Sequence, residues 1–239
     1  MSFVGVNNTS RDGMQRCMQG RTIVAVETST TTTQAASDRA YEHVKRAIIR
    51  GDLPGGAAIS ENALCQEIGV SRTPVHEAFL RLAAEDLLTL ESRKGAVVRP
   101  MSPNEAADVL EMREAIEATA ATRVVTDGRV ADVTPGLQAV LAEQEQAVAT
   151  GDVDRFIEAD ATFHGAVIGA SRNAIAIRFA QTLRDRQNRL RHQLMRVQPS
   201  QLQASLDDHR ALAAALEAGD ATRYAEVLHA HVASHRGAL

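Results

Sequence analysis

The chain has 239 residues, of which 44% are hydrophobic and only 3% aromatic, so it can bury the cores of two modest domains. Its formal net charge of −4 excludes a global basic field that holds nucleic acid regardless of sequence, so any contact with DNA must be local. No apolar run approaches the roughly 18 residues of a membrane span. Cys17 and Cys65 lie far apart and are expected to be free thiols in a reducing cytosol. We therefore expect a cytoplasmic protein without membrane contact.

The first 36 residues show neither helical nor strand periodicity, and residues 28–33 are a run of serine and threonine. This composition favours a flexible tail over residues 1–36. An alternative interpretation is a start codon assigned too early, with Met14 or Met18 as the true first residue.

Three helices are predicted next, at residues 38–50, at residues 61–68 and from Ser71 onwards. Gly69 is suited to end the second helix in a left-handed turn, and Ser71 is a good N-cap for the third. The apolar face of the third helix leaves three polar side chains on its free N-terminal end: Arg72, Thr73 and His76. This arrangement is typical of a helix-turn-helix, whose second helix enters the major groove of DNA.

Two short β-prone runs, residues 88–90 and 96–98, flank a polar turn that ends at Gly95. They predict a hairpin, or wing, with Arg93 and Lys94 at a tip suited to phosphate or minor-groove contact. The residues expected to contact DNA are Ser71, Arg72, Thr73, His76, Arg93, Lys94 and Gly95.

Two prolines within four residues mark residues 101–103 as a linker. It would separate a DNA-binding domain at residues 37–100 from a second domain at residues 104–239. The second domain is predicted to be an antiparallel bundle of helices. Its helices are expected at residues 104–126, 134–150, 152–170, 172–196, 200–218 and 220–235.

Histidine and aspartate interrupt the apolar stripes of this second domain. Asp160 and His164 lie four residues apart on one helix, and His209 and His231 replace core residues on two others. Buried polar groups are costly unless they are paired, and one divalent cation would satisfy all four. Three nitrogens and one oxygen suit Zn²⁺, Ni²⁺, Mn²⁺ or Fe²⁺. Taken singly, each histidine is more simply a satisfied core residue, and His235 is a rival ligand that we discount because helix ends fray.

Part of the chain resembles a known family. The turn Leu53-Pro54-Gly55, the pair Ser60-Glu61 and the run from Ile68 to Val75 look like the winged helix-turn-helix of the GntR family of bacterial transcription regulators. The resemblance covers residues 40–98. The chain departs from it in having His76 where arginine is usual and Asp86 where glycine is usual.

The second half is similar to the FCD effector domain of the FadR subgroup of this family, over roughly residues 102–232. The residues that carry this resemblance are Asp160, His164, Asn173, His209, Gly219, Asp220, Ala225, His231 and Val232. It implies a mainly α fold, a winged helix-turn-helix followed by an all-α bundle, and a metal bound by Asp160, His164, His209 and His231. It also implies that small carboxylates bind beside the metal.

Two arginines are candidates to meet such a carboxylate. Arg113 looks like the family arginine that does so, with an ion pair to Glu117 as an equal alternative. Arg186, on another inward stripe, is the weaker candidate.

These features together predict a homodimeric DNA-binding transcription regulator, a repressor rather than an enzyme, that reads a palindromic operator. A small organic acid bound at the metal site would modulate its affinity for DNA. The alternatives are a regulator for which the metal itself is the signal, a structural metal with no effector, and a metal-dependent hydrolase. The hydrolase is the weakest alternative, because no glutamate or further histidine lies at a sequence spacing that would mark it as a general base.

Overall fold

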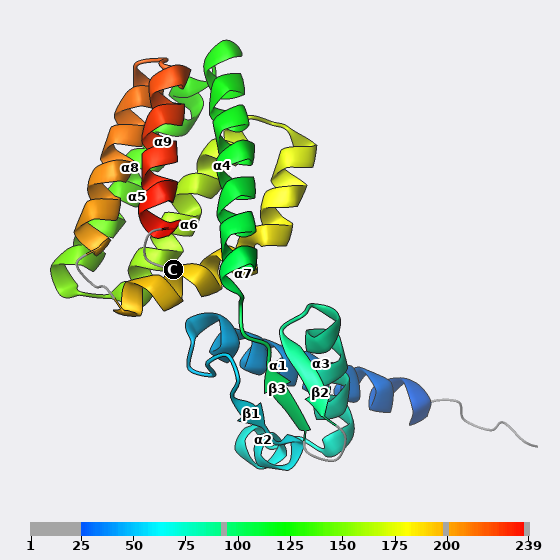
Figure 1. Cartoon of the computed structure of the whole chain (residues 1–239). Helices are drawn as coiled ribbons and strands as arrows, with labels where there is room; N and C mark the ends of the chain where they lie inside the picture. Colours follow the sequence, from blue (N-terminus) through cyan, green and yellow to red (C-terminus); the bar gives the residue numbers. More distant parts are fainter. Residues whose placement is uncertain (1–24, 92–94, 198–200, 237–239) are drawn as a thin grey trace, which may run out of the picture.

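The structure is a computed structural model that describes residues 25–91, 95–197 and 201–236. It contains two units: a small sheet with helices α1 to α3, and a bundle made of helices α4 to α9 (Figure 1). The mainly α fold and the division into a helix-turn-helix and a helical bundle are confirmed. Within the described residues, no helix combines the length and apolarity needed to cross a bilayer.

The N-terminal unit is a winged helix-turn-helix. Its elements are α1 (Ala25–Arg50), β1 (Ala58–Ile59), α2 (Glu61–Ile68), α3 (Arg72–Ala84), β2 (Leu88–Glu91) and β3 (Gly95–Val98). The strands form an antiparallel sheet in the order β1-β3-β2, and the pairing of β2 with β3 is the predicted hairpin. The fully buried side chains of Val44, Val75 and Phe79 join α1 and α3 in one core. Gly69, at a φ of 68°, ends α2 and allows the sharp turn into α3.

The predicted start of α1 is wrong. The helix begins at Ala25 rather than at residue 38, so Ser37 is a buried residue inside it. Threonine weakens a helix by only a fraction of a kcal/mol per residue, and adding residues to an existing helix is easy. The predicted tail over residues 1–36 is therefore too long, and its first 24 residues lie outside the described part of the chain.

Two smaller features of this domain also differ from expectation. Ser71 stands at the N-cap position of α3, but its side chain makes no capping hydrogen bond, whereas Ser60 accepts one from the backbone N–H of Ala63. Strand β1 was not expected. Two residues are too few to show an alternating pattern, and this strand exists because it pairs with β3.

The C-terminal unit is a bundle with its own apolar core. The described helices are α4 (Pro103–Thr126), α5 (Val130–Thr150), α6 (Val153–Ala170), α7 (Ala174–Val197), α8 (Gln201–Glu217) and α9 (Ala221–Arg236). The predicted helices are confirmed to within two residues at their starts, except that α5 begins four residues early, at Val130 rather than at 134, and carries Pro135 in its first turns. Figure 1 shows α7 descending beside α4 and then crossing the end of the bundle that faces α1.

Candidate DNA-binding surface and metal centre

The N-terminal end of α3 presents polar side chains opposite a buried apolar face. That face consists of Val75, Phe79 and Leu82, all fully buried. Burying it against α1 turns Arg72 and His76 outwards, where their side chains are 71% and 55% exposed. The helix therefore offers hydrogen-bonding groups on its free end without burying any of them.

One carboxylate holds both of these side chains. Glu61, the first residue of α2, accepts a hydrogen bond from Arg72 Nε at 2.8 Å on one oxygen and pairs with His76 Nδ1 at 2.8 Å on the other. Hydrogen bonds from His76 and Arg72 lower the pKa of Glu61, which keeps it ionised at neutral pH. Sequence reasoning missed this role, because nothing in the chain order links Glu61 to a helix that begins eleven residues later.

A hollow of about 690 Å³ lies between these helices and the hairpin. Its lining residues are Glu61, Arg72, Thr73, His76, Leu90, Glu91 and Gly95. Four of the residues predicted to contact DNA thus line one concave surface, and Ser71 adjoins it at the start of α3. Arg93 and Lys94 lie outside the described residues.

The backbone of the sheet requires glycine at position 95. Its φ is +100°, and a Cβ built there would lie 2.1 Å from the backbone oxygen of Ile59. Only glycine allows β3 to approach the end of β1 so closely. The sequence pattern pointed to Gly95 as part of the wing, and the structure shows that the position also holds the sheet together.

The predicted metal ligands come together in the core of the bundle. Asp160 and His164 project from α6, His209 from α8 and His231 from α9, and each is at least 96% buried. One ligand atom from each residue lies within 4.8 Å of all the others. Nε2 of His209 is 3.1 Å from Nε2 of His164 and 3.4 Å from Oδ1 of Asp160.

The outward nitrogen of each imidazole is hydrogen-bonded to an acceptor. The pairs are His164 Nδ1 with Glu117 Oε1 at 2.7 Å, His209 Nδ1 with Gln144 Oε1 at 2.8 Å, and His231 Nδ1 with Asp208 Oδ2 at 3.0 Å. Because these oxygens accept, each Nδ1 carries the proton and each Nε2 keeps its lone pair. Such outer partners orient histidines that bind metal ions.

Burial and charge leave the cluster in a state suited to a cation. Burial lowers the pKa of His209 to about 4 and that of His231 well below its usual value, so both are neutral at neutral pH. Burial by itself raises the pKa of Asp160, but the charge of Arg191, whose Nε lies 2.5 Å away, brings it well below the usual value. Neither oxygen of Asp160 accepts a properly directed hydrogen bond from a described residue. A divalent ion fits this donor set.

Arg113 faces the cluster. Its Nη2 contacts Nε2 of His164 and lies 3.3 Å from Nε2 of His231, while its Nε is 3.9 Å from Glu117. The predicted ion pair with Glu117 is therefore present, and the role of Arg113 toward an effector carboxylate stays a prediction. His235, the rival ligand, is buried edge-on against the ring of His231, at 4.7 Å between ring centres, and is not one of the grouped ligands.

A cavity of about 400 Å³ adjoins the cluster between α4, α6 and α7. Arg113 and His164 line it together with two cations of α7, Arg184 and Arg191. Three arginines around one cavity favour an anionic occupant.

The predicted position of Arg186 in this site is wrong. Its Nε lies 3.6 Å from Glu105 and its Nη2 3.9 Å from Asp86, at the boundary between the two domains. Residues 184 and 191 share a helix face, whereas residue 186 lies about 200° around the helix from residue 184. Arg191 is the inward cation that sequence reasoning missed. It follows Arg184 by seven residues, a spacing that places both side chains on one helix face.

Comparisons with known families match both halves of the chain. The family described as "FCD domain" matches residues 108–234, and "Bacterial regulatory proteins, gntR family" matches residues 36–98. The first match alone spans more than half of the chain.

Individual relatives agree with these matches. The "Probable D-xylose utilization operon transcriptional repressor" of Paenarthrobacter nicotinovorans is 30% identical over 86% of this chain and 88% of its own. The "Gluconate operon transcriptional repressor" of Bacillus subtilis is 33% identical over 55% of this chain and 53% of its own. Among solved structures, "E. coli McbR/YncC" shares the fold, with a TM-score of 0.69 and 24% identity over 83% of this chain and 94% of that one.

These families and relatives are regulators rather than enzymes. The winged helix-turn-helix lies mostly within the residues matched by the gntR family, and most of the bundle lies within those matched by the FCD domain. The chain therefore belongs to the GntR family of bacterial regulatory proteins, carries an FCD domain, and is a DNA-binding transcription regulator.

Proposed function

We propose that this protein is a homodimeric repressor whose affinity for a palindromic operator is set by a small carboxylate bound beside a divalent metal ion. The observation that carries the proposal is the group of four buried ligand atoms within 4.8 Å, with all three outer imidazole nitrogens held by acceptors. Repressors named among the relatives support the direction of control.

Asp160, His164, His209 and His231 would hold the ion, which could be Zn²⁺, Ni²⁺, Mn²⁺ or Fe²⁺. A bound cation supplies positive charge that attracts a carboxylate oxygen. Arg113 contacts Nε2 of His164 and lies 3.3 Å from Nε2 of His231, and it would pair with the rest of the effector. The adjoining cavity of about 400 Å³ is of the size that takes a small organic acid.

On the DNA side, Arg72 would read a guanine edge, and Ser71, Thr73 and Gly95 would lie against the backbone with Arg93 and Lys94. Two copies of the chain would place one α3 on each operator half-site. Large apolar side chains exposed on α7, Ile175 at 70% and Phe179 at 56%, favour a contact between the two copies. They lie four residues apart and so share one helix face.

Helix α7 offers a route between the two sites. Arg191 on this helix binds Asp160 of the ligand cluster, and Asp185 on the same helix lies 2.7 Å from Lys45 of α1. Arg189 Nη2 donates to the backbone oxygen of Arg99, next to the interdomain linker, at 2.6 Å. One helix thus contacts both the proposed metal ligands and the DNA-binding domain.

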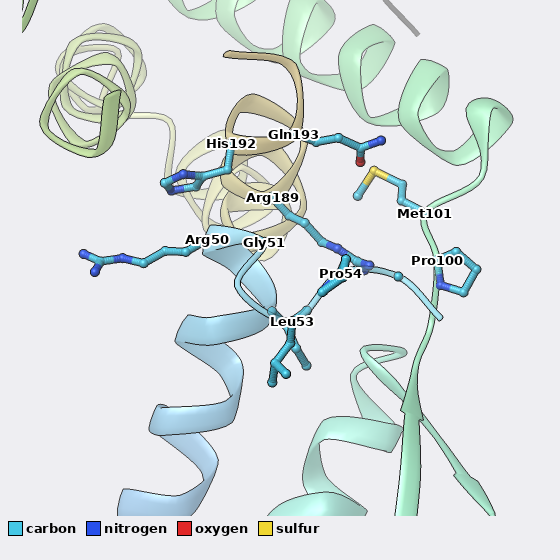
Figure 2. Close-up of a pocket in the computed structure, with 11 residues that line it drawn as sticks. Arg50, Gly51, Leu53, Pro54, Pro100, Met101, Arg189, His192 and Gln193 are labelled. Carbon is cyan, nitrogen blue, oxygen red and sulfur yellow. The ribbon is translucent and has the colours of Figure 1, made fainter. Parts of the chain in front are cut away.

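A cavity lies beside this contact. Figure 2 shows a cavity between the end of α1, the residues Pro100 and Met101 at the domain boundary, and the segment of α7 that carries Arg189 and Gln193. Its volume is about 380 Å³. An effector that displaces α7 would move the recognition helices relative to each other, and only such a difference between two states changes DNA affinity.

The test uses purified full-length protein. Its metal content is measured, and fragments of the source genome are assayed for binding with and without small organic acids and with and without chelator. We expect about one metal ion per chain, sequence-selective binding, and an organic acid that changes the affinity only when metal is present. The proposal would be overturned if the purified protein contained no metal and bound no DNA fragment selectively.

A second candidate is a regulator for which the metal itself is the signal. Four protein ligands can fill a tetrahedral site completely, which leaves no position for an effector oxygen. In that case chelation alone changes DNA affinity, and no organic acid shifts the thermal stability of the metal-loaded protein.

A further inference from the structure

We propose that Glu61 fixes the imidazole of His76 as a hydrogen-bond acceptor toward DNA. The base that His76 faces should then be adenine or cytosine, because these bases present an amino group in the major groove. This inference rests on the proposed role of α3 as the helix that reads the operator.

The argument starts from the chemistry of the supporting carboxylate. Ionised Glu61 can only accept hydrogen bonds, and its side chain is 13% exposed, so it is a partly enclosed and oriented group. Its position at the first residue of α2 favours a negative charge. Nδ1 of His76, 2.8 Å from Glu61, must therefore carry a proton.

A neutral imidazole has one N–H and one bare nitrogen. In the neutral form, with the proton on Nδ1, Nε2 of His76 keeps its lone pair on a side chain that is 55% exposed beside the DNA-facing hollow, and the proposal concerns this form. That nitrogen can accept from N6 of adenine or N4 of cytosine. Opposite guanine or thymine it would meet another acceptor, which is repulsive.

Glu61 leaves Arg72 as a hydrogen-bond donor toward DNA, whereas it leaves His76 as an acceptor. Arg72 donates through Nε to the second oxygen of Glu61, which leaves its two Nη groups as donors on a side chain that is 71% exposed. Successive turns of α3 thus present a donor and then an acceptor. Glu61 is a positioning residue for both, and the family's usual arginine in place of His76 would present donors twice.

The experiment selects binding sites from a library of randomised duplexes with the full-length protein and with the variants Arg72→Ala, His76→Ala, His76→Arg and Glu61→Gln. The operator position whose preference is lost in His76→Ala should be adenine or cytosine in the unchanged protein. His76→Arg should convert it to guanine. Where it is adenine, replacing that base by purine, which lacks the amino group, should weaken binding about tenfold in the unchanged protein and have no effect in His76→Ala.

Glu61→Gln tests the positioning role. A side-chain amide both donates and accepts, so it tolerates either imidazole tautomer, and discrimination at the His76 position should largely disappear. Glu67→Gln is the matched control, because Glu67 lies on the same helix as Glu61 but pairs with His43, and its replacement removes the same charge. This control should leave the preference unchanged.

The outcomes separate the two proposals. Three outcomes would overturn this inference alone, provided that Arg72→Ala still removes a preference for guanine. They are a guanine or thymine at the His76 position, unchanged binding when purine replaces an adenine there, and the lack of any position that responds to His76→Ala. Selection of no preferred sequence by any of the proteins overturns the proposed reading helix and this inference with it.

Discussion

The two polar sites of this protein are built in opposite ways. The proposed DNA-facing site uses exposed side chains from one helix and a single supporting carboxylate, Glu61. The ligand cluster is buried and draws its four ligands and their outer partners from α4, α5, α6, α8 and α9. An exposed site can change its specificity one side chain at a time, whereas a buried one ties its chemistry to the stability of the whole domain.

The largest effect should come from removing a buried ligand. His209→Ala leaves a cavity and strands the Gln144 amide, so we expect the free energy of unfolding to fall by about 2–4 kcal/mol and the bound metal to be lost. Denaturant titration and metal analysis measure the two effects. His229→Ala is the control, because His229 is on α9 but 65% exposed, and it should change stability by less than about 0.5 kcal/mol. Retention of one metal ion by His209→Ala would contradict the proposed ligand set.

A partner behind the ligands should matter less to folding than to metal affinity. Gln144→Ala removes the acceptor that orients His209, and we expect metal affinity to fall about 10–100-fold, measured by competition with a chelator. Gln138→Ala on the same helix is the matched control, because Gln138 bonds to Glu217 at the surface. Equal affinities in the two variants would show that Gln144 is only a packing residue.

The exposed site should respond without loss of stability. Arg72→Ala is expected to lower affinity for the operator about tenfold or more and to change binding to random DNA far less, since a base contact carries sequence information and a phosphate contact does not. Fluorescence anisotropy on both duplexes measures the ratio. Equal losses on the two would mean that Arg72 touches only the backbone.

The smallest effect is expected from a substitution in the contact between α7 and α1, which lies between the two sites. Asp185→Asn weakens the contact of α7 with Lys45, and we expect the effector-induced change in DNA affinity to shrink by a few-fold while DNA and effector binding measured separately stay nearly constant. Because Asp185 is 42% exposed, the stability cost should be under about 1 kcal/mol. An unchanged effector response would rule out this contact as the route of coupling.

Much of the fold followed from local signals. The helix that begins after Ser71, the hairpin around Gly95 and the stripe of Asp160 and His164 were all visible because spacing along a helix or strand sets which side chains share a face. The start of α1 and strand β1 were missed for the same reason. A threonine run and a two-residue strand carry almost no periodic signal.

By itself, the sequence determined the helix-turn-helix, the helical bundle and the four residues that gather in its core, since helical period and burial follow from neighbours in the chain. Only the tertiary structure decided that Arg191 rather than Arg186 faces the cluster, and that Glu61 holds both Arg72 and His76. These pairings join segments brought together by packing, and a residue's own neighbours in the chain do not reveal its partner in space.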